Sequence, residues 1–348
     1  MHKFKHAWAM ILAGGDGHRL SDLTTDATGI PVPKQYCSLL GGPSLLDETI
    51  RRAATVVYHR RISVIVSGQH TRWWRRALPE RLVPHVVVQP RNCGTGNGIL
   101  LQLMHVLRHD AAAEVLMLPA DHYIEDERVL ANAMSCALEH VGQVPEHVVL
   151  LGMPAQVPDP DLGYIMSGPP DATGTCPVLD FIEKPSSSQA RELIARGAMW
   201  NAFIIAARAS TLLRVYEQAV PHVVNAMRNA LGVERGRTAR LEQLYERLPH
   251  VDFSHEIIHE APPGALQVVP VGGCGWSDLG TPEHLGTTLS RLPGSARGLR
   301  APAAAADGML ISLAYRYRGF AGRTSGVAGL DQGAHAMPKR ARPTNPHG

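Results

Sequence analysis

AWAMILAGGDGHRL (residues 7–20) is the stretch of this 348-residue sequence that decides the fold. Its first seven residues are apolar without polar alternation, which predicts a strand buried on both faces. Three glycines follow, so the backbone can turn sharply, approach a ligand closely and offer its N–H groups to phosphate oxygens. Arg19 adds a permanent positive charge. The stretch therefore predicts an anion-binding loop at the end of a buried strand.

Other interpretations of this stretch are weaker. No Gly-Lys-Ser/Thr follows, as a P-loop would require, and Leu20 stands where the third glycine of a GxGxxG dinucleotide motif would fall, which disfavours a dehydrogenase. The basic HKFKH at residues 2–6 mimics a secretory signal, but signal cleavage would not spare the glycine motif. Since no apolar run reaches about 18 residues, we predict no membrane-spanning segment.

Apolar runs and helical patterns alternate along the first half of the chain. Further buried strands are predicted at 62–68, 85–89, 114–120 and 147–153, and helices at 44–57, 70–78, 96–109 and 127–141. This repetition is typical of a doubly wound, mostly parallel, Rossmann-like α/β sheet, in which ligands bind beyond the carboxyl ends of the strands.

The pattern changes after about residue 155. Shorter strands (163–166, 178–183, 200–206, 266–271) mix with helices (187–196, 209–219, 236–247), which predicts a smaller substrate-binding lobe. We therefore expect one domain over 1–292, with halves 1–155 and 156–292. No hexapeptide repeat is present, so we expect no C-terminal β-helix.

Charge separates a tail from this body. Residues 293–348 carry a net charge of +6, whereas the whole chain carries +3. Residues 1–292 therefore carry a net charge of −3. Because the tail is rich in Ala, Gly, Pro and Arg, we expect it to be largely disordered, although 309–320 could form a strand or helix. A nucleic-acid-binding body would carry its own positive face, and Arg72–Arg76 around two tryptophans is the one basic cluster, so nucleic-acid binding is not predicted.

Lysine and cysteine usage add two indications. The chain has five lysines, and only Lys34 and Lys184 lie between residues 6 and 338, which makes both functional candidates. The five cysteines (Cys37, Cys93, Cys136, Cys176, Cys274) are scattered without a CxxC or zinc spacing, which favours a reduced, cytoplasmic setting.

Six motifs in order carry a family resemblance. They are LAGGDGHRL (12–20), PK (33–34), ADH (120–122), GYI (163–165), FIEKP with WN (181–185 and 200–201) and GWSDLG (275–280). Over roughly residues 7–290 the sequence resembles the sugar-1-phosphate nucleotidyltransferases, most closely the mannose-1-phosphate guanylyltransferases. The resemblance implies transfer of a nucleotidyl group from GTP to mannose-1-phosphate, giving GDP-mannose and pyrophosphate, and it makes a homodimer possible.

The resemblance also implies roles for particular residues. Arg19 and Lys34 would neutralise the leaving pyrophosphate, Lys184 would hold the sugar phosphate, and Asp121 and Asp278 would bind Mg²⁺, which prefers carboxylate and phosphate oxygens. The implied nucleotide-binding residues are Leu12, Ala13, Gly14, Gly15, Gly17, Gln89, Gly94 and Thr95. The implied sugar-phosphate-binding residues are Gly163, Glu183, Lys184 and Asn201. We interpret His122 as structural, because an ionised phosphate needs no general base.

Several alternatives stay open at this stage. Asp121 or Asp278 could merely cap a helix. The family's usual Thr, Glu and Tyr are replaced by His18, Gln89 and Leu162, which leaves room for a uridylyl-, thymidylyl- or cytidylyltransferase acting on another sugar. A non-catalytic sensor of nucleotide sugars is a further alternative, disfavoured because every catalytic charge is present.

Overall fold

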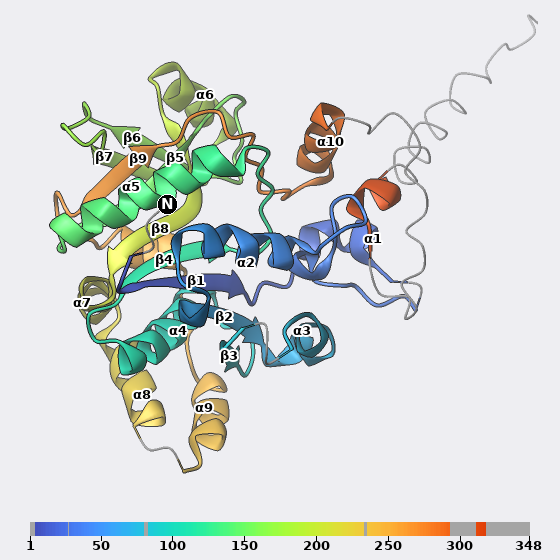
Figure 1. The fold of residues 1–348 in the computed structure, drawn as a ribbon, viewed down its shortest axis with the longest axis vertical. Coiled ribbons are helices and arrows are strands. Elements are labelled where there is room, and N and C mark those ends of the chain that lie inside the picture. Colours follow the sequence, from blue (N-terminus) through green and yellow to red (C-terminus); the bar gives the residue numbers. More distant parts are fainter. Residues whose placement is uncertain (1–3, 27, 80–82, 233–234, 293–310, 318–348) are drawn as a thin grey trace, which may run out of the picture.

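One mixed sheet organises the molecule (Figure 1). The computed structural model describes residues 4–26, 28–79, 83–232, 235–292 and 311–317. Within these ranges nine strands pair in the order β3-β2-β1-β4-β8-β5-β9-β7-β6. Their bounds are β1 (Ala7–Ala13), β2 (Ile62–Ser67), β3 (His85–Gln89), β4 (Glu114–Pro119), β5 (Val148–Pro154), β6 (Gly163–Ser167), β7 (Cys176–Glu183), β8 (Met199–Arg208) and β9 (Leu266–Pro270).

The sheet is less parallel than the sequence predicts. β1 runs parallel to β2 and β4, and β2 runs parallel to β3. β8 then lies antiparallel between β4 and β5, while β6 and β7 form an antiparallel pair. The expectation of a mostly parallel sheet is therefore wrong for the second half. Burial on both faces makes a strand apolar whichever way it runs, so the apolar runs did not encode direction.

Helices cover both faces of the sheet (Figure 1). Their bounds are α1 (Ser21–Thr24), α2 (Leu45–Val56), α3 (Thr71–Ala77), α4 (Thr95–His109), α5 (Glu127–Gln143), α6 (Ser187–Ala195), α7 (Ala209–Ala219), α8 (Pro221–Leu231), α9 (Arg237–Tyr245) and α10 (Pro282–Arg291). Side chains of β1 alternate between two cores: Ile11 belongs to the core that includes residues of α2 and α5, and Met10 to the core that includes residues of α4 and α7. No helix among the described residues is long and apolar enough to cross a membrane.

The helix caps test the alternative that Asp121 or Asp278 merely caps a helix. Asp126 caps α5 by accepting from the N–H groups of Arg128 and Val129, and Thr281 caps α10 by accepting from His284 N–H. Neither Asp121 nor Asp278 is the N-cap of these helices. Both carboxylates are therefore available for another purpose.

The strand directions bring several loops to one edge. The loops after β1, β3 and β4 all lie at the carboxyl ends of parallel strands. Because β8 is antiparallel to β4, its first residues, including Asn201, also lie at that edge. The sheet thus gathers there segments that are far apart in the sequence.

A short C-terminal segment packs against the sheet domain. The N–H of Ser38 donates to Ile311 O, and Ser38 O accepts from Leu313 N–H, both at 2.9 Å. Residues 313–317 form a helical turn, and Leu313 is fully buried in the core. The folded unit therefore extends beyond the expected boundary at 292. The predicted disorder of 293–310 and 318–348 concerns residues outside the described ranges.

This packing makes a stability prediction. Leu313→Ala should lower the free energy of unfolding by about 3 kcal/mol, because it opens a cavity in the core. Tyr315→Ala is the matched control, since Tyr315 is 47% exposed on the same segment and its loss should change stability by less than about 0.5 kcal/mol. Urea denaturation of the full chain measures both. Equal effects would contradict the docking of this segment.

Candidate active site

A cavity of about 320 Å³ opens at the carboxyl edge of the sheet. Most of the residues predicted for the site line it. They are Leu12, Gly14, Gly15, Gly17, Arg19, Gln89, Gly94, Thr95, Asp121, Gly163, Glu183, Asn201 and Asp278. Ala13, Lys34 and Lys184 are not part of the lining. Folding thus unites residues separated by up to 266 positions along the sequence, counting from Leu12 to Asp278.

The glycine loop after β1 is fixed from beneath by Gln35. The side-chain amide of Gln35, which is 3% exposed, donates to Ala13 O and Gly15 O, both at 2.9 Å. Gly17 adopts the left-handed region at φ 68°, which favours glycine. Sequence reasoning missed Gln35, although it directly follows Lys34. The loop therefore offers its backbone to the cavity in a fixed shape.

Asp16 ties the glycine loop to its neighbours. Its carboxylate accepts from the Asn92 side-chain amide at 3.0 Å and lies 3.1 Å from Nε2 of His70. Asn92 belongs to the loop after β3, and His70 precedes α3. These contacts were not predicted, because nothing in the local pattern joins the three residues.

Gln89 lies at the end of β3 and closes the inner part of the cavity. It is 3% exposed, and its Oε1 has no hydrogen-bond partner among the described residues. A Cβ on Gly14 would come within 2.5 Å of Gln89 Nε2, so a larger residue there would have to displace the Gln89 amide. A buried amide with unused hydrogen-bonding capacity is well suited to contact a polar edge of a ligand.

Gly94 and Thr95 form the start of α4 beside this amide. Gly94 has φ 93°, and a Cβ there would overlap the carbonyl oxygen of Val251. Oγ1 of Thr95 accepts from Phe253 N–H at 3.1 Å. The N-terminus of α4 thus points at the cavity, where its dipole favours negative charge.

Lys34 connects the two candidate metal ligands. Its ammonium lies 2.9 Å from Oδ2 of Asp121 and donates to Asp278 O at 2.5 Å and Leu279 O at 3.3 Å. Its side chain is only 7% exposed, whereas Asp121 is 34% exposed and faces the cavity. The ammonium therefore orders the loops that carry both carboxylates, and the contact with the leaving pyrophosphate that the family resemblance implies for Lys34 stays a prediction.

Asp278 is held by a second cation, His284. Nδ1 of His284 lies 2.7 Å from Oδ1 of Asp278, and Nε2 lies 2.9 Å from Oδ2 of Asp159. The hydrogen bonds with Asp159 and Asp278 raise the pKa of His284 to about 10. Burial alone would raise the pKa of Asp278, but its hydrogen bond with His284 and the charge of Lys34 lower it well below the usual range. Asp278 is therefore ionised at neutral pH.

Asp121 is ionised for a related reason. Burial opposes its charge, yet the nearby ammonium of Lys34 lowers the pKa of Asp121 below its usual value. His122 beside it stays neutral, because burial lowers its pKa to about 4. Nδ1 of His122 accepts from Trp276 Nε1–H at 3.2 Å, which agrees with the structural role expected for this histidine.

Arg19 lies at the mouth of the cavity. Its guanidinium is 2.9 Å from Oδ2 of Asp161 and 3.8 Å from Oδ2 of Asp278, and its side chain is 55% exposed. Asp161 was not predicted, since it precedes β6 without any distinguishing pattern. An exposed guanidinium with one weak and one close partner can turn toward an entering anion at little cost.

The opposite wall carries the residues expected to bind the sugar. A Cβ on Gly163 would lie 2.5 Å from Oε2 of Glu183, so glycine leaves room for this carboxylate. Burial raises the pKa of Glu183 above its usual value, while the charge of Lys184 opposes the rise. Nζ of Lys184 lies 4.0 Å from Oε1 of Glu183 and its side chain is 53% exposed. Asn201 is 8% exposed, and its Oδ1 accepts from Phe203 N–H.

This fold and cavity agree with a family match. Residues 8–292 match the family model described as nucleotidyl transferase, which covers well over half of the chain. The protein belongs to this nucleotidyl transferase family.

Curated relatives narrow the similarity. The chain is 28% identical over 278 residues to the xanthan biosynthesis protein XanB of Xanthomonas campestris pv. campestris, which covers 78% of this chain and 57% of the relative. It is 26% identical over 288 residues to a mannose-1-phosphate guanylyltransferase of Klebsiella pneumoniae, covering 78% and 58%. The chain thus spans little more than half the length of these relatives.

Solved structures are also similar to this chain. A Thermus thermophilus protein named mannose-1-phosphate geranyltransferase has a TM-score of 0.71 and 27% identity, covering 83% of this chain and 80% of that one. A Helicobacter pylori protein named mannose-6-phosphate isomerase has a TM-score of 0.61 at 19% identity, covering 78% and 99%, and supports the fold alone.

The buried position of Lys34 generates a stability prediction. Lys34→Met should lower the free energy of unfolding by about 3 kcal/mol at pH 7, because it leaves the Asp121 carboxylate and two carbonyls without their cation. Adding Asp121→Asn should recover part of that loss, since Asn carries no charge. Urea denaturation of both variants measures the difference.

Lys5→Met is the control for these two variants, because it also removes a lysine charge but Lys5 is exposed. It should leave stability within about 0.5 kcal/mol of the wild type. If the single and double variants lost the same stability, the ion pair between Lys34 and Asp121 would not organise this region.

Proposed function

We propose that this protein transfers a nucleotidyl group from GTP to mannose-1-phosphate, giving GDP-mannose and pyrophosphate. The observation that carries the proposal is the pairing of Asp121 with the loop of Asp278 through Lys34, beneath the glycine loop. Membership of the nucleotidyl transferase family and similarity to a mannose-1-phosphate guanylyltransferase support it.

The reaction joins two anions, so positioning and charge neutralisation are the main tasks of the protein. A phosphate oxygen of the sugar phosphate attacks the α-phosphorus, and the bond to the leaving pyrophosphate breaks on the opposite side. The backbone of Gly14, Gly15 and Gly17 wraps the triphosphate. Arg19, exposed at the mouth, turns from Asp161 toward the pyrophosphate. Lys34 acts through the carboxylates that it orders.

The donor set at the cavity fits a magnesium ion. Asp121 and Asp278 are ionised carboxylates, and Mg²⁺ prefers one or two such ligands together with phosphate oxygens. These two residues would hold the ion. When bound, it would supply positive charge that offsets the charge of the phosphates.

Different residues contact the sugar phosphate and the base of the nucleotide. Glu183 faces the cavity beside Gly163, where its carboxylate can accept from sugar hydroxyls, and Lys184 at the rim holds the sugar phosphate. Asn201 completes this wall. The buried amide of Gln89 contacts the base. Because an amide both donates and accepts hydrogen bonds, Gln89 also keeps a uridylyl-, thymidylyl- or cytidylyltransferase as the second candidate. A cytoplasmic location and a homodimer stay predictions.

Pyrophosphate release tests the proposal. Purified full-length protein and Mg²⁺ are combined with GTP, UTP, dTTP, CTP or ATP and with mannose-1-phosphate or glucose-1-phosphate. We expect release with GTP and mannose-1-phosphate. Release with another pair would change the substrates and keep the reaction. Nucleotide binding without release for any pair would favour a sensor of nucleotide sugars.

Substitution of the carboxylates tests the proposed metal ligands. Asp121→Asn or Asp278→Asn should lower pyrophosphate release at least about 100-fold, because the ion and the phosphates lose a charged ligand. Asp180→Asn, at an exposed residue of β7, is the control and should keep wild-type turnover. Circular dichroism verifies that each variant folds. Wild-type turnover in either substituted protein would remove that residue from the metal site.

A further inference from the structure

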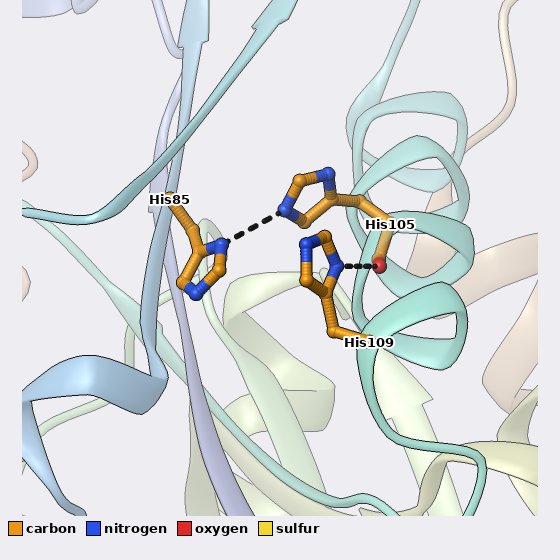
Figure 2. Close-up of side chains that lie close together, drawn as sticks. All are labelled: His85, His105 and His109. Carbon is orange, nitrogen blue, oxygen red and sulfur yellow. Dashed lines mark hydrogen bonds between the residues drawn. The ribbon is translucent and has the colours of Figure 1, made fainter. Parts of the chain in front are cut away.

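Three histidines, which Figure 2 shows close together, lie at the ends of β3 and α4 that are farther from the cavity. His85 begins β3, and His105 and His109 lie one turn apart near the end of α4. One ligand nitrogen from each lies within 4.8 Å of the others. Gln89 and Thr95 lie at the other ends of the same two elements, so the histidines are about 13 Å from Gln89 along β3. The cluster is therefore separate from the candidate active site.

Backbone carbonyls fix the protonation of two of these rings. Nε2 of His85 lies 3.2 Å from Arg60 O, and Nδ1 of His109 lies 2.9 Å from His105 O. A carbonyl only accepts, so each of these nitrogens carries the proton. The lone pairs are consequently at Nδ1 of His85 and Nε2 of His109. A backbone carbonyl that orients a metal-binding imidazole is a recurrent arrangement in metal sites.

The third ring completes the group. Nε2 of His105 lies 3.3 Å from Nδ1 of His85, a separation compatible with two ligands on one tetrahedral ion at about 2.0–2.1 Å from each nitrogen. Without an ion, His105 donates this proton to His85. Moving the proton to Nδ1 of His105 would free its Nε2 as a ligand.

The surroundings favour the neutral form of two of the rings, His85 and His105. Burial and the neighbouring imidazoles lower the pKa of His105 to about 4, and burial and His109 lower the pKa of His85. Neutral imidazole is the form that binds a metal. Trp8 packs on the cluster, with its ring centroid 4.9 Å from that of His85 and 5.9 Å from that of His109.

We propose that His85, His105 and His109 form a zinc site that joins the start of β3 to the end of α4. Three imidazoles without a carboxylate suit a borderline transition metal and not Mg²⁺ or Ca²⁺, which require oxygen ligands. The charges of Arg108 and Arg237 also lower the pKa of His105, which keeps this imidazole in the neutral form that binds a metal. His109 is exposed, so water can take the fourth position.

Zinc binding to the full-length protein tests this site. Chelator-stripped protein is titrated with Zn²⁺ against a chromophoric chelator, in excess Mg²⁺ so that the carboxylates of the cavity are occupied. We expect one equivalent of Zn²⁺, and substitution with Co²⁺ should give the visible absorption of a four-coordinate ion. His105→Gln and His109→Gln should each weaken Zn²⁺ binding by at least about tenfold.

The controls separate this site from other histidines and from folding defects. His222→Gln, exposed on α8, should bind Zn²⁺ as the wild type does. Zn²⁺ should raise the Tm of the wild type and not that of His109→Gln, whose exposed side chain can be replaced without loss of the fold. No binding by the wild type, equal binding by the cluster variants, or loss of binding only in Asp121→Asn would overturn the proposal.

Discussion

The ammonium of Lys34 is the contact on which the candidate active site depends. It is buried between the loop after β4 and the loop before α10, and it bonds to a carboxylate in one and to carbonyls in the other. These loops are joined by no other charged contact of comparable burial within the described residues. A lysine suits this position because its compact ammonium has three donors that point in different directions, whereas the donors of the larger guanidinium all lie in one plane.

The sequence predicted the elements well and their pairing less well. The apolar runs that became β1 to β5 and the helical patterns between them were predicted within a few residues, because burial and periodicity are local properties. The antiparallel insertion of β8 was missed, since strand direction depends on the path of the chain between strands. α8 was missed as well, because Pro221 at its start was not recognised as a first-turn proline.

In the candidate site, too, local motifs were predicted and contacts between distant residues were not. Residues in contiguous motifs, such as Gly14 and Asp121, were predicted and line the cavity. Partners that only folding brings together were not: His284 reaches Asp159 across 125 positions, and Asp16 reaches Asn92 across 76. The pair His105 and His109 does have a local signal, since two histidines four residues apart share one face of a helix. Its third member, His85, comes from a neighbouring strand.

The docking of residues 311–317 has a consequence for how the chain acquires its structure during synthesis. The carbonyl oxygens of Ser38 and Leu39, only a few positions beyond Lys34, accept hydrogen bonds from the N–H groups of Leu313 and Ala314. These donors are synthesised late. They leave the ribosome long after the strands of the parallel half of the sheet have left it. A chain ending at residue 292, where the family match stops, would lack these partners. Residues past the end of the matched domain therefore complete the hydrogen bonding of a segment near its start.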